Sequence, residues 1–284
     1  MAAIHKNGCL SNSMCYYAAE SVTEEIMELY SVIRSIKAEE SYQNLSDNLN
    51  TVFQRLDYLI AQDICDKRAE EFIYNPGFDS AFDAISSFRS LYTAKIEVEH
   101  AKAIIKSKDP WKTLKNFAYI PNYLQLAKTE YQGSPLKPGD QVLFLGSGPL
   151  PISLIILCRL YGLRGVGIEQ EPDRAELSRM VLQKLEFSDQ IRIIAGNHFT
   201  LPLEEKFELI MVAAQAEPKK AIFDHLAEVL PAGTKVSYRI YEKGLRRLLD
   251  TFSRYELPEP FVEYLRIAPK PPVNNTVVFL TTNG

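Results

Sequence analysis

Two glycines and a glutamate have the spacing of a nucleoside-binding site. The apolar run 141–145 (QVLFL) ends at Gly146-Ser147-Gly148, and a helical pattern begins shortly afterwards. Glycine lets a ligand approach the backbone because it has no Cβ, and the amino end of the next helix favours a carboxylate or a phosphate. Glu169 ends the next predicted strand about twenty residues on, where a carboxylate can bind ribose hydroxyl groups. A plain strand-to-helix turn with a surface glutamate is the alternative.

The glycine turn departs from the dinucleotide-binding pattern. The third glycine is replaced by Pro151, which disfavours NAD and fits an S-adenosylmethionine site better. After the third predicted strand, where related binders often have an aspartate that contacts adenine, the chain has Gly196-Asn197-His198. An asparagine can donate to the adenine ring and accept from its amino group. Asn197 and His198 therefore remain candidates for that contact.

The elements around these residues change character along the chain. From about Val22 to Leu126 the apolar residues recur at helical spacing, and a long helix is predicted over 80–106. After position 141, short apolar runs alternate with helical stretches, and two β-rich runs follow at 261–267 and 276–281. We therefore predict a helical subdomain over 1–132 and an α/β domain with a parallel sheet over 133–284, with an antiparallel element near its end. Residues 133–139 are predicted to be the linker.

Composition narrows the class of protein. Of the 284 residues 46% are hydrophobic and 24% charged, which is typical of a globular protein and excludes a disordered chain. The net charge of −4 disfavours nucleic acid as a partner, and no apolar run has the ~20 residues that a membrane span needs. The first twenty residues lack a secretory pattern, and the four cysteines and four histidines are scattered. We expect a cytoplasmic protein without a metal site.

Several motifs in a fixed order resemble one family. They are KIEVEHAKAII, DPWKTLKNF, PNYLQLAK, FLGSGPLPISLIILCRLYG, GIEQEPDRAELSRMVL, IMVAAQAEPKKAIF, YRIY and VNNT. Together they resemble the nicotianamine synthases, closest to the archaeal form, and more loosely the bacterial opine-metallophore synthases of the staphylopine type. The resemblance covers the stretch from Tyr92 to Val278, and the first eighty residues match weakly.

The resemblance implies a Rossmann-like fold of the class I S-adenosylmethionine methyltransferase type, with the helical subdomain as a lid. Such enzymes transfer the 3-amino-3-carboxypropyl (aminobutyrate) group of S-adenosylmethionine to an amine and release 5'-methylthioadenosine. It implies an amino-acid acceptor (glutamate, histidine or a second S-adenosylmethionine), a metallophore product and no catalytic metal. A homodimer is considered as well. A small-molecule N-methyltransferase is the alternative, and a non-catalytic binding module ranks last because the glycine turn and Glu169 are intact.

The resemblance also implies the catalytic residues. Glu97 stands at the position of the family's proposed base, and on a helix it would share a face with Thr93 and other small residues, as a cavity wall does. Burial should raise the pKa of Glu97 toward neutrality. A solvated helix face is the alternative, and Glu99 is the weaker candidate. Tyr123 matches the family tyrosine that lines the reaction cavity, Tyr119 is the nearby alternative, and core packing is the ordinary role of both.

Further residues are expected to bind the donor or the acceptor. Arg239 at the end of a predicted strand is the best candidate for a carboxylate clamp. Asn274 and Asn275 line the substrate channel or form a turn, and Glu217 binds an ammonium group or caps the next helix. The residues expected to contact S-adenosylmethionine are Gly146, Ser147, Gly148, Pro149, Leu150, Glu169, Gln170, Asn197, His198, Ala213 and Ala214.

Overall fold

The computed structural model describes residues 12–39, 47–62, 64, 66–250, 255–271 and 273–283. The chain forms two compact units, one of Met1–Ser90 with Lys243–Leu249 and the other of Leu91–Glu242 with Asp250–Gly284. The predicted boundary between residues 132 and 133 therefore falls inside the second unit. The reason is that the helical residues after position 90 share a core with the sheet: Ala101, Ile104 and Leu114 pack in the same cluster as Val142 and Phe144.

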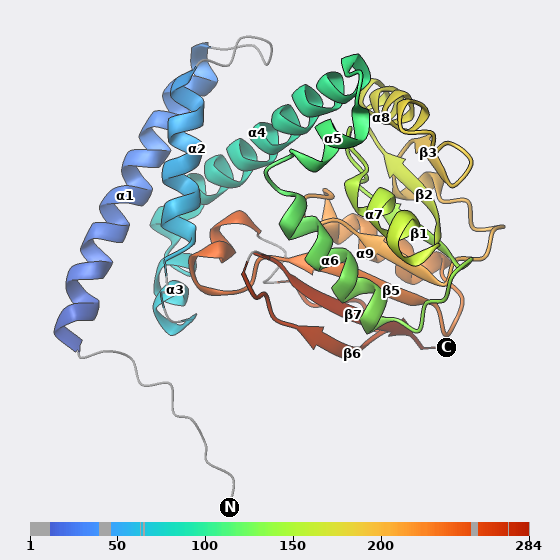
Figure 1. Ribbon diagram of the computed structural model, residues 1–284. Coiled ribbons are helices and arrows are strands. Elements are labelled where there is room, and N and C mark those ends of the chain that lie inside the picture. The colour runs from blue at the N-terminus through green and yellow to red at the C-terminus, as the bar shows by residue number, and fades with distance from the viewer. Residues whose placement is uncertain are drawn as a thin grey trace, which may run out of the picture. The chain divides into compact units, whose positions relative to one another are not determined.

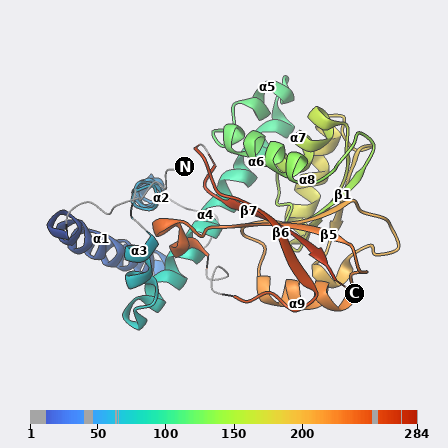
Figure 2. The ribbon, with the colours of Figure 1, turned by 90° about the horizontal axis from the view of Figure 1, so that it is seen from below.

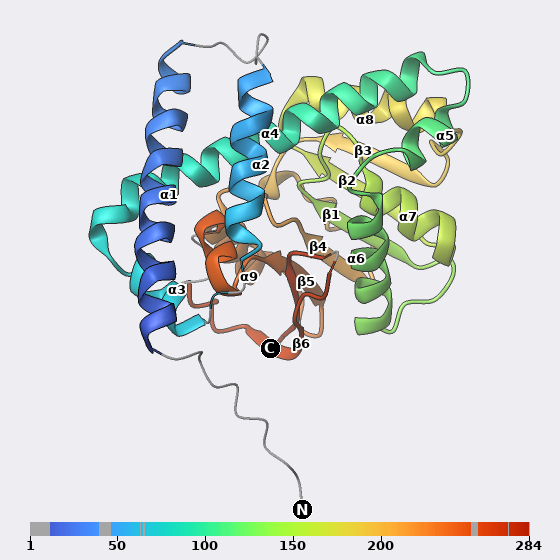
Figure 3. The same ribbon diagram turned by 60° about the vertical axis from the view of Figure 1, so that its left-hand side comes forward.

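The first unit is helical in its described part. Its elements are α1 (Asn12–Glu39), α2 (Asp47–Ile60), α3 (Asp66–Ile73), the 3₁₀ helix η1 (Pro76–Phe78), the first part of α4 (Asp79–Lys106) and the 3₁₀ helix η3 (Gly244–Leu249). Helices α1 and α2 run side by side (Figure 3). Their predicted apolar stripes are buried, with Ile26, Leu29 and Leu56 all 0% exposed. Hydrophobic burial therefore joins these two helices.

The second unit contains a seven-stranded sheet. Its strands are β1 (Gln141–Leu145), β2 (Arg164–Glu169), β3 (Ile191–Ala195), β4 (Leu209–Val212), β5 (Lys235–Ile240), β6 (Phe261–Ile267) and β7 (Thr276–Thr282). They lie in the order β3-β2-β1-β4-β5-β7-β6, and β1 to β5 are parallel while β7 runs antiparallel to both β5 and β6. The central strands are apolar runs because both faces of the sheet are covered.

Helices cover both faces of this sheet. They are the second part of α4, α5 (Pro110–Lys115), α6 (Ile120–Gly133), α7 (Ile152–Tyr161), α8 (Pro172–Lys184), the 3₁₀ helix η2 (His198–Thr200) and α9 (Lys219–Val229). Helices α6, α7 and α8 lie on one side of the sheet and α9 on the other (Figures 1 and 2).

The predicted linker was wrong at its first residue: Gly133 ends α6, and a Cβ there would lie 2.2 Å from the Phe279 ring of β7. Glycine is needed at that position for close packing.

The strand order locates the site. The order reverses between β1 and β4, and ligands of open α/β sheets bind outside the carboxyl ends of the strands at such a point. Gly146 follows β1, Glu169 ends β2 and Ala213 follows β4, so three segments with predicted site residues meet at this edge.

In the described part of the chain, no helix is long and apolar enough to cross a membrane.

Candidate active site

A glycine turn follows β1 at the carboxyl edge. Gly146 and Gly148 have φ angles of 78° and 74°, in the left-handed region that favours glycine. The N–H groups of Gly146 and Ser147 both donate to the Ile168 carbonyl of β2 at 3.0 Å. A Cβ on Gly146 would lie 3.1 Å from the Cβ of Ala216, so the turn also packs closely against the loop after β4. Glycine is required at both positions.

Glu169 is held between the glycine turn and the start of α8. Its Oε2 accepts a hydrogen bond from the Gly148 N–H at 3.0 Å, and its Oε1 accepts one from the Glu171 N–H at 3.1 Å. Glu169 is 5% exposed, and this burial raises the pKa of its carboxyl group, while the two hydrogen bonds act in the opposite direction. The carboxylate keeps lone pairs that can accept bonds from ligand hydroxyl groups.

Glu97 of α4 contacts the same turn. A Cβ on Gly148 would lie 2.9 Å from Glu97 Oε2, and the Tyr123 hydroxyl of α6 donates to Glu97 Oε1 at 2.8 Å. Burial raises the pKa of Glu97 to about 7, with Glu169 adding to the rise, whereas the Tyr123 hydrogen bond and Arg174 lower it. Burial also holds the pKa of Tyr123 well above its usual value. The fold thus brings Glu97, Tyr123 and the glycine turn into one cluster.

Arg239 has an internal partner that the sequence did not predict. Its Nε and Nη2 donate to the two carboxylate oxygens of Glu130 at 2.8 Å each, and Nη2 also donates to the Ser153 hydroxyl at 3.0 Å. All three residues are buried, because α6 and α7 both cover this part of β5. The edge of the guanidinium that would clamp a substrate carboxylate is therefore taken by Glu130. This ion pair argues against the carboxylate-clamp role that we predicted for Arg239.

Glu217 and Ala214 lie in the loop after β4, where a buried lysine organises the backbone. The Glu217 side chain is exposed and accepts from the Lys219 N–H at 3.1 Å, which is the predicted alternative of a cap on the next helix. The Lys219 ammonium donates to the Ala214 carbonyl and to Asp250 Oδ2, the latter at 3.0 Å. Asp250 Oδ2 also accepts from the Tyr241 N–H at 3.3 Å. This ion pair connects the loops after β4 and β5.

Asn197 and His198 begin the crossover from β3 to β4. Asn197 is exposed, and its Oδ1 accepts from the Phe199 N–H at 3.0 Å, so that it caps η2. This bond uses one of the two lone pairs of the oxygen, so the side chain still has an acceptor and its amide N–H groups for the adenine contact that we predicted. His198 is buried, its Nε2 lacks a partner among the described residues, and burial lowers the pKa of its imidazole.

The remaining predicted residues divide by burial. Asn275 is 5% exposed and its Nδ2 has no partner in the described part of the chain, whereas Asn274 is half-buried. Tyr119, the residue before α6, packs edge-to-face on Phe117 and against the core cluster. Gln170 is exposed, Ala213 and Ala214 are half-buried, and Ser147, Pro149 and Leu150 are buried.

Sequence reasoning missed several charged or polar residues near this cluster. Glu130 stands seven positions after Tyr123, so helical spacing alone could have placed both on one face of α6. Tyr241, the last residue of the YRIY motif, is buried and raises the pKa values of Tyr123 and Arg239 electrostatically. Arg174, in the first turn of α8, acts on both Glu97 and Glu169. Nothing in the spacing of Arg174 marked it as a site residue.

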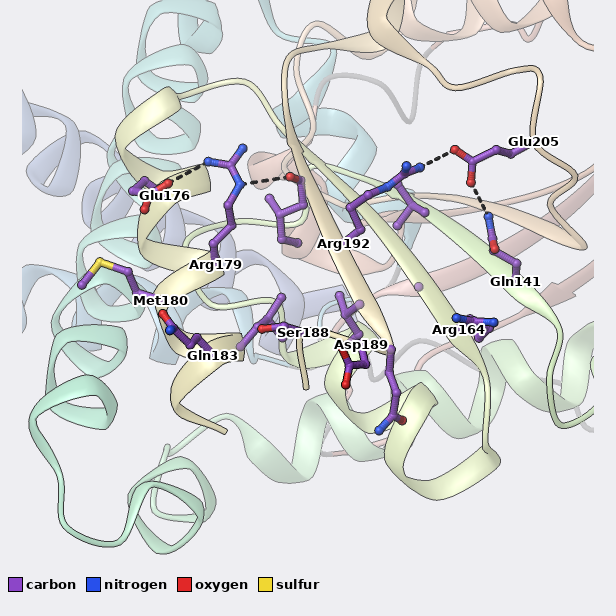
Figure 4. A pocket seen from close by; sticks show the side chains of 16 residues that line it. Gln141, Arg164, Glu176, Arg179, Met180, Gln183, Ser188, Asp189, Arg192 and Glu205 are labelled. Carbon is purple, nitrogen blue, oxygen red and sulfur yellow. Dashed lines mark hydrogen bonds and ion pairs between the residues drawn. The ribbon is translucent and has the colours of Figure 1, made fainter. Parts of the chain in front are cut away.

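A separate groove lies at the opposite end of the strands. It has a volume of about 740 Å³ and surrounds the edge strand β3, between α8 and the starts of β1 and β2 (Figure 4). Arg179 and Glu176 form an ion pair on one side of β3, and Arg192 and Glu205 form another on its other side (Figure 4). The groove contains none of the predicted site residues. We therefore assign the candidate active site to the carboxyl edge.

The fold and the site define a class of protein. A parallel sheet whose order reverses between β1 and β4, an antiparallel β7 beside β5, a glycine turn after β1 and a carboxylate at the end of β2 make a Rossmann-like fold of the class I S-adenosylmethionine methyltransferase type. The chain belongs to the nicotianamine synthase family, since the family model described as "Nicotianamine synthase protein" matches residues 15–283. The predicted fold and family resemblance are thereby confirmed.

Solved structures of the family cover nearly the whole chain. This chain is 30% identical to MtNAS, whose crystal structure in complex with MTA and tNA matches it with a TM-score of 0.81. The match covers 92% of this chain and 98% of the MtNAS chain. A glutamate-to-glutamine mutant of MtNAS in complex with S-adenosylmethionine is 27% identical, with a TM-score of 0.80 and the same coverage. The likeness thus includes both units.

Curated relatives agree with this family at lower identity. An L-histidine 2-aminobutanoyltransferase of Yersinia pestis is 21% identical to this chain over an alignment of 193 residues, and the match covers 60% of this chain and 72% of that protein. Nicotianamine synthase 3 of Oryza sativa subsp. indica is 26% identical to this chain over an alignment of 160 residues, and the match covers 51% of this chain. The aligned part spans 46% of the rice protein, so about half of its length is matched.

Proposed function

We propose that this chain transfers the aminobutyrate group of S-adenosylmethionine to the amine of an amino-acid acceptor and releases 5'-methylthioadenosine, in the synthesis of a nicotianamine-like or opine metallophore. Membership of the nicotianamine synthase family supports an enzyme of this type. The observation that carries the proposal is the Glu97 carboxylate, which lies against Gly148 of the glycine turn with Tyr123 bound to it. A base thus lies directly beside the predicted donor site.

The carboxyl edge fits S-adenosylmethionine as the donor. The buried Glu169 carboxylate has lone pairs left for the ribose hydroxyl groups, and the buried Ser147 hydroxyl lacks a partner within the described residues. Gly146, Gly148, Pro149 and Leu150 would border the donor, as would Gln170, Asn197, His198, Ala213 and Ala214. When bound, the donor supplies an electrophilic carbon next to a positively charged sulfur. Among described residues, no group of three His, Cys, Asp or Glu side chains could hold a metal ion.

Glu97 is suited to take the proton of the acceptor amine. An amine must be neutral to attack carbon, and a carboxylate with a pKa near neutrality accepts a proton better than an exposed one. The Tyr123 hydroxyl orients this carboxylate through its 2.8 Å hydrogen bond. Which carbon next to sulfur reacts then depends on the position in which these residues hold the acceptor, and for this reason the same fold can serve either methyl or aminobutyrate transfer.

The pH profile is expected to report Glu97 directly. Because the carboxylate form is the base and its pKa is about 7, kcat/KM should rise as the pH increases through about 7 and then level off. The Tyr123 hydrogen bond stabilises the charged form of Glu97 and lowers its pKa, so Tyr123→Phe should move this limb to higher pH. The measurement is the initial rate of methylthioadenosine release from pH 5 to pH 9. If the rising limb of kcat/KM stays at the same pH in Tyr123→Phe, that limb does not report the titration of Glu97.

Gly148→Ala is expected to disturb Glu97 as well as the backbone. Its φ of 74° costs a side-chain-bearing residue about 1–2 kcal/mol, and its new Cβ would lie 2.9 Å from Glu97 Oε2. Gly139→Ala is the matched control, because Gly139 has φ 91° with no atom within 4 Å of an added Cβ. Urea denaturation should show similar losses for the two variants, while methylthioadenosine release should fall strongly only in Gly148→Ala. Equal activity in both variants would contradict the contact with Glu97.

Mass spectrometry tests the proposed reaction. The protein is incubated with S-adenosylmethionine and a pool of amino acids that includes glutamate and histidine. Methylthioadenosine together with an amino acid heavier by one or more aminobutyrate units would establish the transfer and identify the acceptor. An S-adenosylmethionine that itself carries an added aminobutyrate unit would identify a second S-adenosylmethionine as the acceptor. S-adenosylhomocysteine with a methylated product would instead make the chain an N-methyltransferase and overturn the proposal.

Four finer expectations remain proposals. A nicotianamine-like product has alternating amines and carboxylates and would bind transition metals, which gives the chain a role in metal homeostasis. A cytoplasmic location is proposed from the scattered cysteines, of which Cys158 is a buried free thiol. A homodimer is proposed as the assembly, and size-exclusion chromatography with light scattering tests it. The lid role of the N-terminal helices likewise stays a prediction.

A further inference from the structure

Binding an amino acid requires a cation for its carboxylate, and two buried cations of the second unit are already neutralised. Glu130 occupies the bidentate edge of Arg239 at 2.8 Å, and Asp250 lies 3.0 Å from the Lys219 ammonium. Removing either cation from its internal partner would leave a buried carboxylate uncompensated, which is costly. Neither is therefore well suited to release its partner for a substrate.

Arg174 differs from these two cations. It lies in the first turn of α8 and is half-buried, and its guanidinium has no ion-pair or hydrogen-bond partner within the part of the chain that the structure describes. The start of α8 is tied to the site, because the Glu171 N–H donates to Glu169 and the Gly148 N–H donates to the same carboxylate. Glu97 in turn contacts Gly148. A chain of direct contacts thus runs from the start of α8 to the proposed base.

The electrostatic effect of Arg174 agrees with its position at the start of α8. The Arg174 charge lowers the pKa of Glu97 and also that of Glu169, so the guanidinium lies within range of both carboxyl groups. An α-amino acid carries its carboxylate one carbon away from its amine. A cation that binds the carboxylate of an amino acid whose amine faces Glu97 must therefore lie near Glu97, and Arg174 satisfies this condition.

We propose that Arg174 binds the α-carboxylate of an amino-acid ligand at the carboxyl edge of the sheet, the role that Glu130 prevents Arg239 from filling. The inference rests on the proposed function. The carboxylate has two sources, the aminobutyrate arm of S-adenosylmethionine and the acceptor amino acid. Arginine suits either one because its planar fork matches a carboxylate with two parallel hydrogen bonds. A purely structural Arg174 would only offset the repulsion between Glu97 and Glu169.

Ligands without the carboxylate distinguish these roles. For the donor, the affinities of Arg174→Met for S-adenosylmethionine and for its decarboxylated form are measured by calorimetry. For the acceptor, L-glutamate and L-histidine are compared with their α-amides in the presence of methylthioadenosine. Arg174→Lys keeps the charge without the fork, and Arg179→Met is the matched control, since Arg179 lies five positions on in α8 and pairs with Glu176 at 2.9 Å.

Loss of a charge-assisted hydrogen bond should weaken binding about 10- to 100-fold, and only for the ligand that carries the carboxylate. A selective loss for S-adenosylmethionine assigns Arg174 to the donor arm, and a selective loss for the amino acids assigns it to the acceptor. Arg174→Lys should fall between Arg174→Met and the wild type, and Arg179→Met should match the wild type. Equal losses with and without the carboxylate, or no loss for any ligand, would overturn the inference.

This test is separate from that of the proposed function. The binding measurements need no turnover, whereas the proposed function stands or falls on methylthioadenosine and a heavier amino acid in the wild-type reaction. A wild-type protein that methylates its substrate could still show carboxylate-selective binding by Arg174. A wild-type protein that transfers aminobutyrate could likewise show no carboxylate-selective binding by Arg174.

Discussion

Glu97→Gln is expected to lower kcat by about 10²- to 10⁴-fold, which is the contribution of a positioned general base. Glutamine has nearly the same shape, so the contact with Gly148 persists and the amide oxygen can still accept from the Tyr123 hydroxyl. The amide cannot take a proton from the acceptor amine. Methylthioadenosine release measures the loss, and calorimetry should show an affinity for S-adenosylmethionine close to that of the wild type.

Glu99→Gln is the matched control for that experiment. Glu99 lies two positions on in α4, is exposed, and makes a 3.7 Å ion pair with Lys95 on the helix surface. Removing its charge should leave turnover within about twofold of the wild type, because exposed ion pairs contribute little. If Glu97→Gln turns over as fast as Glu99→Gln, Glu97 is not the general base of the reaction.

Glu130→Leu is expected to lower the free energy of unfolding by about 3–5 kcal/mol, because it leaves a buried guanidinium without its counter-charge. The side chains of Arg239 and Glu130 are 5% and 1% exposed, and two hydrogen bonds of 2.8 Å join them. Urea denaturation can be followed by the fluorescence of Trp111, the single tryptophan, which packs on Phe187 in the second unit. The midpoint should move to a lower urea concentration.

The double variant Glu130→Leu with Arg239→Met isolates the cost of the uncompensated charge. Replacing a whole buried pair by apolar side chains is often neutral or stabilising, so the double variant should regain most of the lost stability. If the single and double variants unfold at the same urea concentration, the loss comes from packing and not from charge. Recovery in the double variant would support the view that Glu130 neutralises Arg239 in the folded protein.

Local patterns were enough to predict much of the fold. The strands 141–145, 191–195 and 261–267 have the predicted bounds, and α8 begins at Pro172 as expected for proline at a first helical position. The unit boundary was wrong because a helical period does not say which surface a helix packs against. Residues 91–133 are mostly helical, as the pattern predicts, but their apolar faces pack on the sheet with Val142 and Phe144.

The sequence by itself determined the glycine turn, Glu169 and the family, because backbone conformation at Gly146 and Gly148 and strand endings depend on residues close in the chain. Only the tertiary structure decided which charges neutralise one another. Glu130 and Arg239 are 109 positions apart, and Lys219 and Asp250 are 31 apart. A sequence shows that an arginine is present and does not show whether a distant carboxylate already binds it. That pairing is set by the packing of α6 against the sheet, and it is the reason why we propose Arg174 as the cation for a ligand.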